Sequence, residues 1–138
     1  MNWNMIFEWT IEHITIVLIA TAISVVVSIL LAIAGYWVRP LGKLILTFSD
    51  VIQTIPSIAL LSMLMIWFGL GDTTMIAGLV LYSLLPIVRN THTGLLEVPA
   101  HITEAAKGMG MTKLQRLYQI ELPLALPFIL TGIRIALV

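Results

Sequence analysis

Residues 14–38 read ITIVLIATAISVVVSILLAIAGYWV, a run of 25 residues that contains no charged side chain. A helix needs roughly 20 such residues to cross the hydrocarbon core of a bilayer, so this run is long enough to span it. The composition agrees, because 59% of the 138 residues are hydrophobic and 10% are charged, whereas about 25% are charged in soluble domains. The sequence therefore predicts an all-α, polytopic membrane protein.

The same composition excludes several classes of function. The formal net charge is zero and predicts no nucleic-acid partner, and the absence of cysteine excludes disulfides and thiolate metal sites. His13, His92 and His101 do not fall at metal-ligand spacing, so no metal site is expected. The phosphate-binding pattern G-x-x-x-x-G-K-[ST] does not occur. We therefore expect no cofactor and no enzyme activity of the chain itself.

Three further apolar stretches follow, at about 44–70, 73–90 and 124–138. Residues 39–43, with a proline, a glycine and two cations, separate the first span from the second, and 69–74 form a short polar turn. The third run is short, so we expect its helix to draw on residues 89–95 or to be shielded by neighbouring helices. The fourth run is too short to cross, which predicts a single membrane domain, residues 1–138, that is incomplete at its C-terminus.

The basic residues predict the orientation. Lys and Arg of the loops lie within 39–43 and 89–123, whereas the N-terminal segment and the turn at 69–74 have none. The positive-inside rule therefore predicts that 39–43 and the loop at about 91–123 face the cytoplasm and that the N-terminus lies outside. Residues 1–13 lack the positive charge of a signal peptide. They are expected to form either an interfacial helix or a frayed leader.

Two prolines lie within the predicted spans and point to a candidate translocation path. Pro56 and Pro86 each remove a backbone N–H, which membranes tolerate where a neighbouring group or water satisfies the freed carbonyl. The helix faces around them therefore face a bundle or a cavity, unless each proline is only a kink. The candidate path residues are Gln53, Thr54, Pro56, Tyr82, Pro86 and Arg134.

Charged and small residues inside the spans carry further expectations. Arg134 lies deep in the fourth span and is interpreted either as a lining group or as a structural arginine bonded to freed carbonyls. Asp50 is expected to pair with Lys43 or Arg39. Small residues recur every four positions in the first span and predict close helix packing; they are Ala20, Ser24 and Ser28.

Between the third and fourth spans, the polar segment predicts two short helices. Pro99 suits the start of the first helix, and glycines at 108 and 110 can end it, because glycine adopts the left-handed conformation freely. Thr112 and Gln115 have the spacing of a capping box for the second helix. Pro123 is expected to end that helix. The first helix has a narrow apolar face that predicts either a protein partner or packing on the chain's own bundle: Ile102, Ala105, Ala106 and Met109.

This segment resembles the EAA loop of the permease subunits of ABC importers. The family pattern E-A-A-x3-G-x9-I-x-L-P is met at every defined position. The resemblance implies a type I importer permease fold in which the first loop helix, the coupling helix, docks on a cytoplasmic ATPase subunit. The coupling residues carried over by position are Glu104, Ala105, Ala106, Gly110, Ile120, Leu122 and Pro123.

A longer resemblance points to a solute class. The segments 51–61, 81–94, 107–113 and 121–134 are similar to permeases of osmoprotectant importers for glycine betaine, carnitine and choline. Such permeases continue with further spans after the last of these segments. The resemblance implies a permease in the bacterial cell membrane with separate ATPase subunits, a second permease copy and an extracytoplasmic binding protein or domain. The alternatives are an importer for another small solute, such as an amino acid, and an ATP-independent channel or membrane scaffold.

Overall fold

The structure is a computed structural model and describes residues 2–138. These residues form seven α-helices and one π-helical turn, with no strand among them, which confirms the all-α prediction. The elements in chain order are α1 (Trp3–Trp37), α2 (Arg39–Thr54), α3 (Ser57–Phe68), α4 (Asp72–Leu96), α5 (Ala100–Gly108), α6 (Lys113–Arg116), the π-helical turn η1 (Leu117–Glu121) and α7 (Leu122–Leu137).

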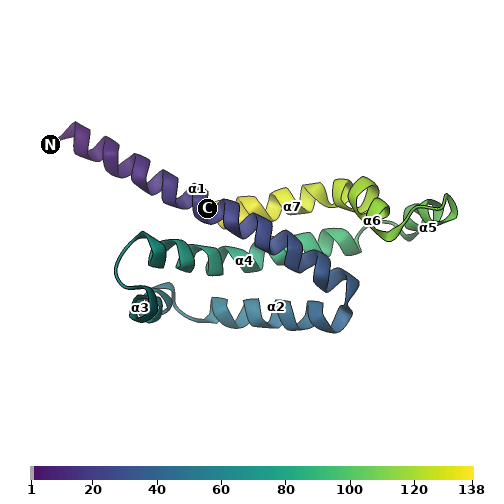
Figure 1. Ribbon diagram of the computed structural model, residues 1–138, viewed down its shortest axis with the longest axis horizontal. Helices are drawn as coiled ribbons and strands as arrows, with labels where there is room; N and C mark the ends of the chain where they lie inside the picture. Colours follow the sequence, from purple (N-terminus) through teal and green to yellow (C-terminus); the bar gives the residue numbers. More distant parts are fainter. Residues whose placement is uncertain (1) are drawn as a thin grey trace.

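Helices α1, α2, α4 and α7 run roughly along the long axis of the molecule, and the remaining elements lie at its two ends (Figure 1). Helices α1 and α4 and the continuous helical segment Lys113–Leu137 are each long and apolar enough to cross a membrane, and α2 with α3 makes a fourth span if the bent pair counts as one. The N-terminus and α3 lie at one end, whereas the α1–α2 corner, α5 and α6 lie at the other (Figure 1). The two predicted sides of the membrane are therefore at opposite ends of the molecule.

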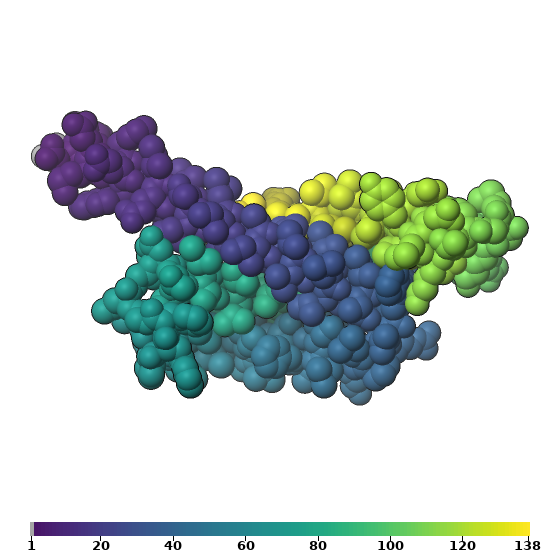
Figure 2. Space-filling view, in the orientation of Figure 1, coloured from purple at the N-terminus to yellow at the C-terminus, as the bar shows by residue number. Residues whose placement is uncertain are grey.

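Helix α1 is longer than the predicted first span. It begins at Trp3 and continues without a break to Trp37, so residues 3–13 are neither frayed nor a separate helix. The first buried residue is Ile16, and the N-terminal part projects beyond the other helices (Figure 2).

The small residues of α1 form its contact face, as predicted. Ala20, Ser24 and Ser28 are buried, and the Ser28 hydroxyl donates a hydrogen bond to the Leu84 carbonyl of α4 at 3.5 Å. Near its end, α1 touches α2 through glycine backbones: a Cβ on Gly35 would lie 2.7 Å from the Cα of Gly42. This close approach allows the chain to reverse at Val38.

Residues 39–43 do not form a separate loop, and the second predicted span is bent near Pro56. Residues 39–43 are the first turn of α2, where Pro40 is tolerated because its missing N–H has no helical partner. The span breaks after Thr54, and α3 is bent by 101° from α2. Ile55 is extended, as is favoured before a proline, and Pro56 is the N-cap of α3.

Helix α4 lies between α1 and α7 and forms the core of the molecule. Its residues Ile87, Val88 and Leu95 are almost completely buried. It continues to Leu96, so the short third run does draw on the residues that follow it.

The prediction that a helix ends at Pro123 was wrong. The helical path continues from Lys113 through η1 into α7, and Pro123 lies in the first turn of α7. The proline directly follows the π turn, where the regular four-residue hydrogen-bond pattern is already interrupted, so its missing N–H does not end the helical path.

Candidate functional site

The polar loop projects from one end of the bundle and exposes one face of α5. Pro99 is the N-cap of α5, as predicted. Ala106 is completely buried within the chain, whereas Glu104 and Ala105 are exposed and Met109 is 74% exposed. The predicted apolar face is therefore divided, because one alanine packs inward and the other is free to meet a partner.

Gly110 forms the corner after α5. Its φ of +81° lies in the left-handed region, and its N–H donates to the Lys107 carbonyl at 2.9 Å. Gly108 has no positive φ and ends α5 as an ordinary helical residue. Of the two glycines predicted to make the corner, only Gly110 is required by its backbone conformation.

The predicted capping box follows the corner. The Thr112 N–H donates to Gln115 Oε1 at 2.9 Å, and the Gln115 N–H donates to Thr112 Oγ1 at 3.2 Å. Both contacts satisfy N–H groups that the short helix α6 leaves unpaired. The side chains of Thr112 and Gln115 thus stabilise the start of α6, where the chain turns back toward the bundle.

The second half of the EAA pattern packs into the bundle. Leu122 contacts a buried cluster of Leu95, Leu117, Ala125 and Ile129, and Ile120 is half-buried. Between them, the buried Glu121 carboxylate accepts a hydrogen bond from Arg116 Nε at 3.0 Å. This pair was not predicted, because the two residues are five apart and would not meet on an ordinary α-helix.

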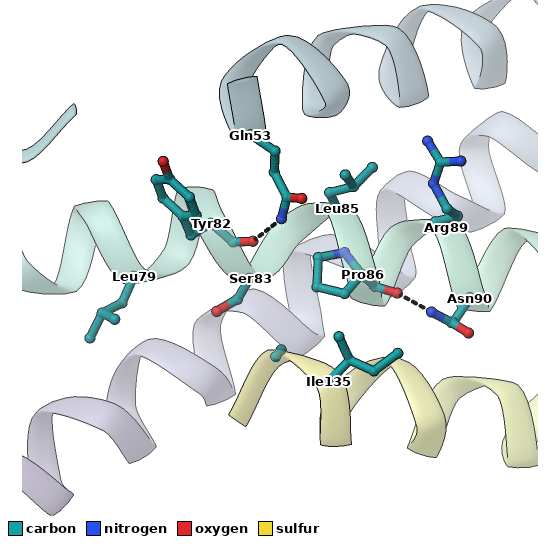
Figure 3. A pocket seen from close by; sticks show the side chains of 10 residues that line it. Gln53, Leu79, Tyr82, Ser83, Leu85, Pro86, Arg89, Asn90 and Ile135 are labelled. Carbon is teal, nitrogen blue, oxygen red and sulfur yellow. Dashed lines mark hydrogen bonds between the residues drawn. The ribbon is translucent and has the colours of Figure 1, made fainter. Parts of the chain in front are cut away.

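A groove with both apolar and polar lining residues lies among α2, α4 and the end of α7 (Figure 3). It encloses about 420 Å³, and Gln53, Tyr82 and Pro86 line it. Gln53 Nε2 donates to the Tyr82 carbonyl at 2.9 Å, which is the carbonyl that Pro86 leaves without its helical N–H partner. This confirms that a neighbouring helix satisfies the freed carbonyl.

A second contact ties the helix break to the same place on α4. The Tyr82 hydroxyl donates a hydrogen bond to the Ile55 carbonyl, at the point where α2 gives way to α3. Beyond the proline, Asn90 Nδ2 donates to the Pro86 carbonyl at 2.7 Å. Gln53, near Pro56, therefore bonds the backbone of α4, and Tyr82, near Pro86, bonds the backbone at the α2–α3 break.

An ion pair crosses from α2 to α4 at the edge of the groove. Asp50 pairs with Arg89, so the expected pairing with Lys43 or Arg39 was wrong. Lys43 lies two helical turns away along α2, about 10 Å by the helical rise, whereas Arg89 approaches from the side. The two side chains are 50% and 52% exposed.

Comparison with known proteins identifies the family. Residues 24–138 match the sequence profile described as binding-protein-dependent transport system inner membrane component. The chain belongs to this family of ABC-importer permeases. It is a membrane-spanning transport component rather than an enzyme, which confirms the resemblance drawn from the EAA pattern.

Curated relatives of the permease carry names of osmoprotectant transport. It is 48% identical over 122 residues to the choline transport system permease protein OpuBD of Bacillus subtilis (strain 168), covering 88% of this chain and 52% of the relative. It is 42% identical over 137 residues to the glycine betaine/carnitine/choline transport system permease protein OpuCD of the same organism, covering 99% and 60%. It is 52% identical over 102 residues to the osmoprotectant import permease protein OsmY of Salmonella typhimurium (strain LT2), covering 71% and 43%. The permease chain thus spans about half the length of these relatives.

The remaining candidate path residues lie away from the groove of the permease. The Thr54 hydroxyl donates to the Val51 carbonyl of its own helix, and Pro56 caps the start of α3. Arg134 is exposed on α7 and makes no hydrogen bond or ion pair with residues 2–138, so its interpretation as an arginine bonded to freed carbonyls is not supported. The groove combines Gln53, Tyr82 and Pro86 from the predicted set with Arg89 and Asn90, which were not predicted to line it. Asp50 reaches its edge as the partner of Arg89.

Proposed function

We propose that this permease moves quaternary-ammonium compatible solutes, the class that includes glycine betaine, carnitine and choline, into the bacterial cell. The names of the relatives support the solute class. The observation that carries the coupling is the loop geometry: Glu104, Ala105 and Met109 are exposed on α5, which is held away from the bundle by the Gly110 corner. Such a face is suited to docking on another protein.

The partners belong to the same proposal. The phosphate-binding pattern is absent from these residues, so the energy for active uptake would come from separate ATPase subunits that contact α5. A second permease copy would complete the membrane pathway, and an extracytoplasmic binding protein or domain would deliver the solute. ATP-driven approach of the two ATPases would then move the loops of both permease copies together.

We further propose that the loop faces the cytoplasm and that the N-terminus lies outside. Arg39, Lys43, Lys107, Lys113 and Arg116 belong to the end of the molecule that holds α5 and α6. Cytoplasmic loops are enriched in such residues. The same orientation would direct α5 toward the ATPase and the α3–α4 turn toward the extracytoplasmic partner.

The groove around Pro86 is the proposed part of the solute path. Asp50 lies eleven residues beyond the start of α2, about 16 Å by the helical rise, and four residues before its end at Thr54. Its half-exposed ion pair with Arg89 is therefore far from the charged end of α2 at Arg39. Charges at that depth face protein or water rather than lipid. Gln53, Tyr82 and Asn90 add hydrogen-bonding groups to the same side, which suits a water-filled route.

Uptake of radiolabelled glycine betaine tests the proposed function. The complete coding sequence would be expressed with its ATPase and binding partner in salt-stressed cells that lack their own carriers. We expect ATPase-dependent uptake by the wild type and its loss in Gly110→Val, because a β-branched residue is strongly disfavoured at a φ of +81°. Gly108→Val is the matched control, since neither glycine has an atom within 4 Å of an added Cβ and only Gly110 has positive φ.

The outcomes separate the solute from the coupling. Uptake that is insensitive to Gly110→Val would contradict a coupling role for the loop and would favour an ATP-independent channel. Intact ATPase association without betaine uptake would instead discard the solute class, and uptake of an amino acid would then identify the alternative importer.

A further inference from the structure

The helical path between the loop and α7 contains one wide turn. In η1, the N–H of Leu122 donates to the carbonyl of Leu117, five residues earlier, instead of the four-residue interval of an α-helix. The turn therefore takes up an extra residue between α6 and α7. Such π turns inside helices are often found at functional sites.

The wide turn brings Arg116 and Glu121 together. Residues five apart on an α-helix point about 140° away from each other, because each residue turns the helix by about 100°. The π turn places positions separated by five one above the other, and the Arg116 Nε to Glu121 Oε1 distance is 3.0 Å. The ion pair and the π turn therefore depend on each other.

This ion pair is buried among three spans. The side chains of Arg116 and Glu121 are 14% and 3% exposed. The adjacent apolar cluster contains Leu117 of η1 and Leu95 of α4, and Tyr36 of α1 lies beside Glu121. Removing one partner of such a pair leaves an uncompensated buried charge, so the geometry is maintained only while both charges are present.

The turn also connects the loop to the groove. On the loop side, the Thr112–Gln115 capping box and the Gly110 corner join α6 to α5. On the other side, α7 runs to Gly132, where an added Cβ would lie only 2.8 Å from the Pro86 carbonyl oxygen. A displacement of α5 thus has a continuous path of close contacts to the residues that line the groove.

We propose that Arg116 and Glu121 are positioning residues that join α6, η1 and α7 into one rigid unit, through which movement of α5 reaches the groove. This inference rests on the proposed function, because it assumes that a partner moves α5. Without the ion pair, the π turn would relax and α5 could move while α7 stays in place. The ATPase would then still bind, but ATP hydrolysis would no longer drive solute movement.

A distance measurement tests the rigid unit without requiring transport. Residues 1–138 contain no cysteine. In the complete protein, with any other cysteine replaced, Met109→Cys at the C-cap of α5 and Leu130→Cys on α7 give two exposed spin-label sites. We expect a narrow distribution of the distance between the two spin labels when the Arg116–Glu121 ion pair is intact, and a broad distribution in Glu121→Gln. An unchanged distribution in Glu121→Gln would overturn the inference.

Reconstituted transport provides the second readout, the number of solute molecules moved per ATP hydrolysed. We expect Glu121→Gln and Arg116→Gln to lower this ratio roughly tenfold, within the usual range of coupling effects, while ATPase association is retained. Lys113→Gln is the matched control, because it removes a cation from the same helix at an exposed position over the ring of Trp37. A ratio equal to that of the wild type would contradict the role of the ion pair.

The charge-reversed variant Arg116→Glu/Glu121→Arg shows whether the single variants lose coupling only because they fail to fold. If the single variants fail to assemble, restored assembly and restored coupling in the reversed pair would support the inference. Failure of the reversed pair as well would overturn it, since the ion pair would then serve folding alone. Uptake by the wild type tests the proposed function separately, because the inference concerns only the difference between variants and wild type.

Discussion

Gly132 is the residue at which α7 approaches the backbone of α4. A Cβ at this position would lie 2.8 Å from the Pro86 carbonyl oxygen and 3.0 Å from the Ile87 Cα. These are backbone atoms and cannot rotate away as a flexible side chain would. Because Pro86 lines the groove, glycine at position 132 determines how closely α7 can approach α4 beside the groove.

We expect Gly132→Ala to destabilise the permease by about 1–3 kcal/mol, the usual cost of inserting a methyl group into a packed interface. Gly108→Ala is the matched control, because an added Cβ there meets no atom within 4 Å and the backbone φ is not positive. Thermal unfolding of the complete protein in detergent measures both. Equal transition temperatures for the two variants would show that the helices do not touch at residue 132.

The Asp50–Arg89 pair shows the limit of residue-level prediction. Asp50 was expected to pair with a cation close to it in sequence, but Arg89 is 39 residues away. Which charges meet depends on how α2 and α4 lie against each other, and no local pattern contains that information. The freed Tyr82 carbonyl, in contrast, could be predicted from Pro86 alone, because the lost N–H is a property of the residue.

At the scale of elements, the α2–α3 break and α4 are joined by reciprocal contacts. Gln53 of α2 donates to the Tyr82 carbonyl, and the Tyr82 hydroxyl donates to the Ile55 carbonyl in the break. Each contact satisfies a backbone group near one of the two prolines. The bent pair and the proline-containing helix are therefore stabilised together.

A double-mutant cycle tests this dependence. We expect Gln53→Leu to cost about 0.5–1.5 kcal/mol, the usual net contribution of one hydrogen bond, because it removes the side-chain partner of the Tyr82 carbonyl. The same substitution should cost much less in a Pro86→Ala background, where the introduced alanine supplies the backbone N–H that α4 lacks. Unfolding in a mixed-detergent titration gives the four free energies. A cost of Gln53→Leu that is equal in both backgrounds would contradict the structural role of this bond.

Local signals predicted the short elements better than the long ones. Pro99, Gly110 and the Thr112–Gln115 box act within a few residues, so the helix–corner–helix path of the loop followed from the sequence. The 101° bend after α2 did not, because a proline interrupts a helix without fixing the direction that follows. The π turn also escaped prediction, since apolar periodicity cannot show one extra residue in a turn.

At the scale of the whole molecule, the chain has two chemically different ends. One end holds the α3–α4 turn with the highly exposed Leu70, and the other holds α5 with Met109. Between them, the exposed residues of α1 from Leu18 to Leu30 are all apolar, as at Val26, whereas the groove side carries an ion pair and amides. This asymmetry suits lipid on one side of the bundle and water on the other.

Thiol labelling of single cysteines tests both the orientation and the water-filled groove. In intact cells, we expect a membrane-impermeant reagent to label Leu70→Cys and to label Met109→Cys only after permeabilisation. A small water-soluble reagent should modify Leu79→Cys in the groove, whereas Val26→Cys, the lipid-facing control, should react poorly because thiolates do not form in lipid. Labelling of Met109→Cys in intact cells would invert the orientation, and unreactive Leu79→Cys would contradict the solute path.

The π turn has a consequence for how the EAA pattern is understood. The pattern fixes nine residues between Gly110 and Ile120, and η1 uses one more residue than an α-helix would over the same rise. Each residue gained or lost in this interval would rotate α5 by about 100° about the axis of α7. The number of residues in this interval therefore determines the orientation of α5 about the axis of α7. The spacing of the motif specifies the direction in which the exposed side of α5 faces.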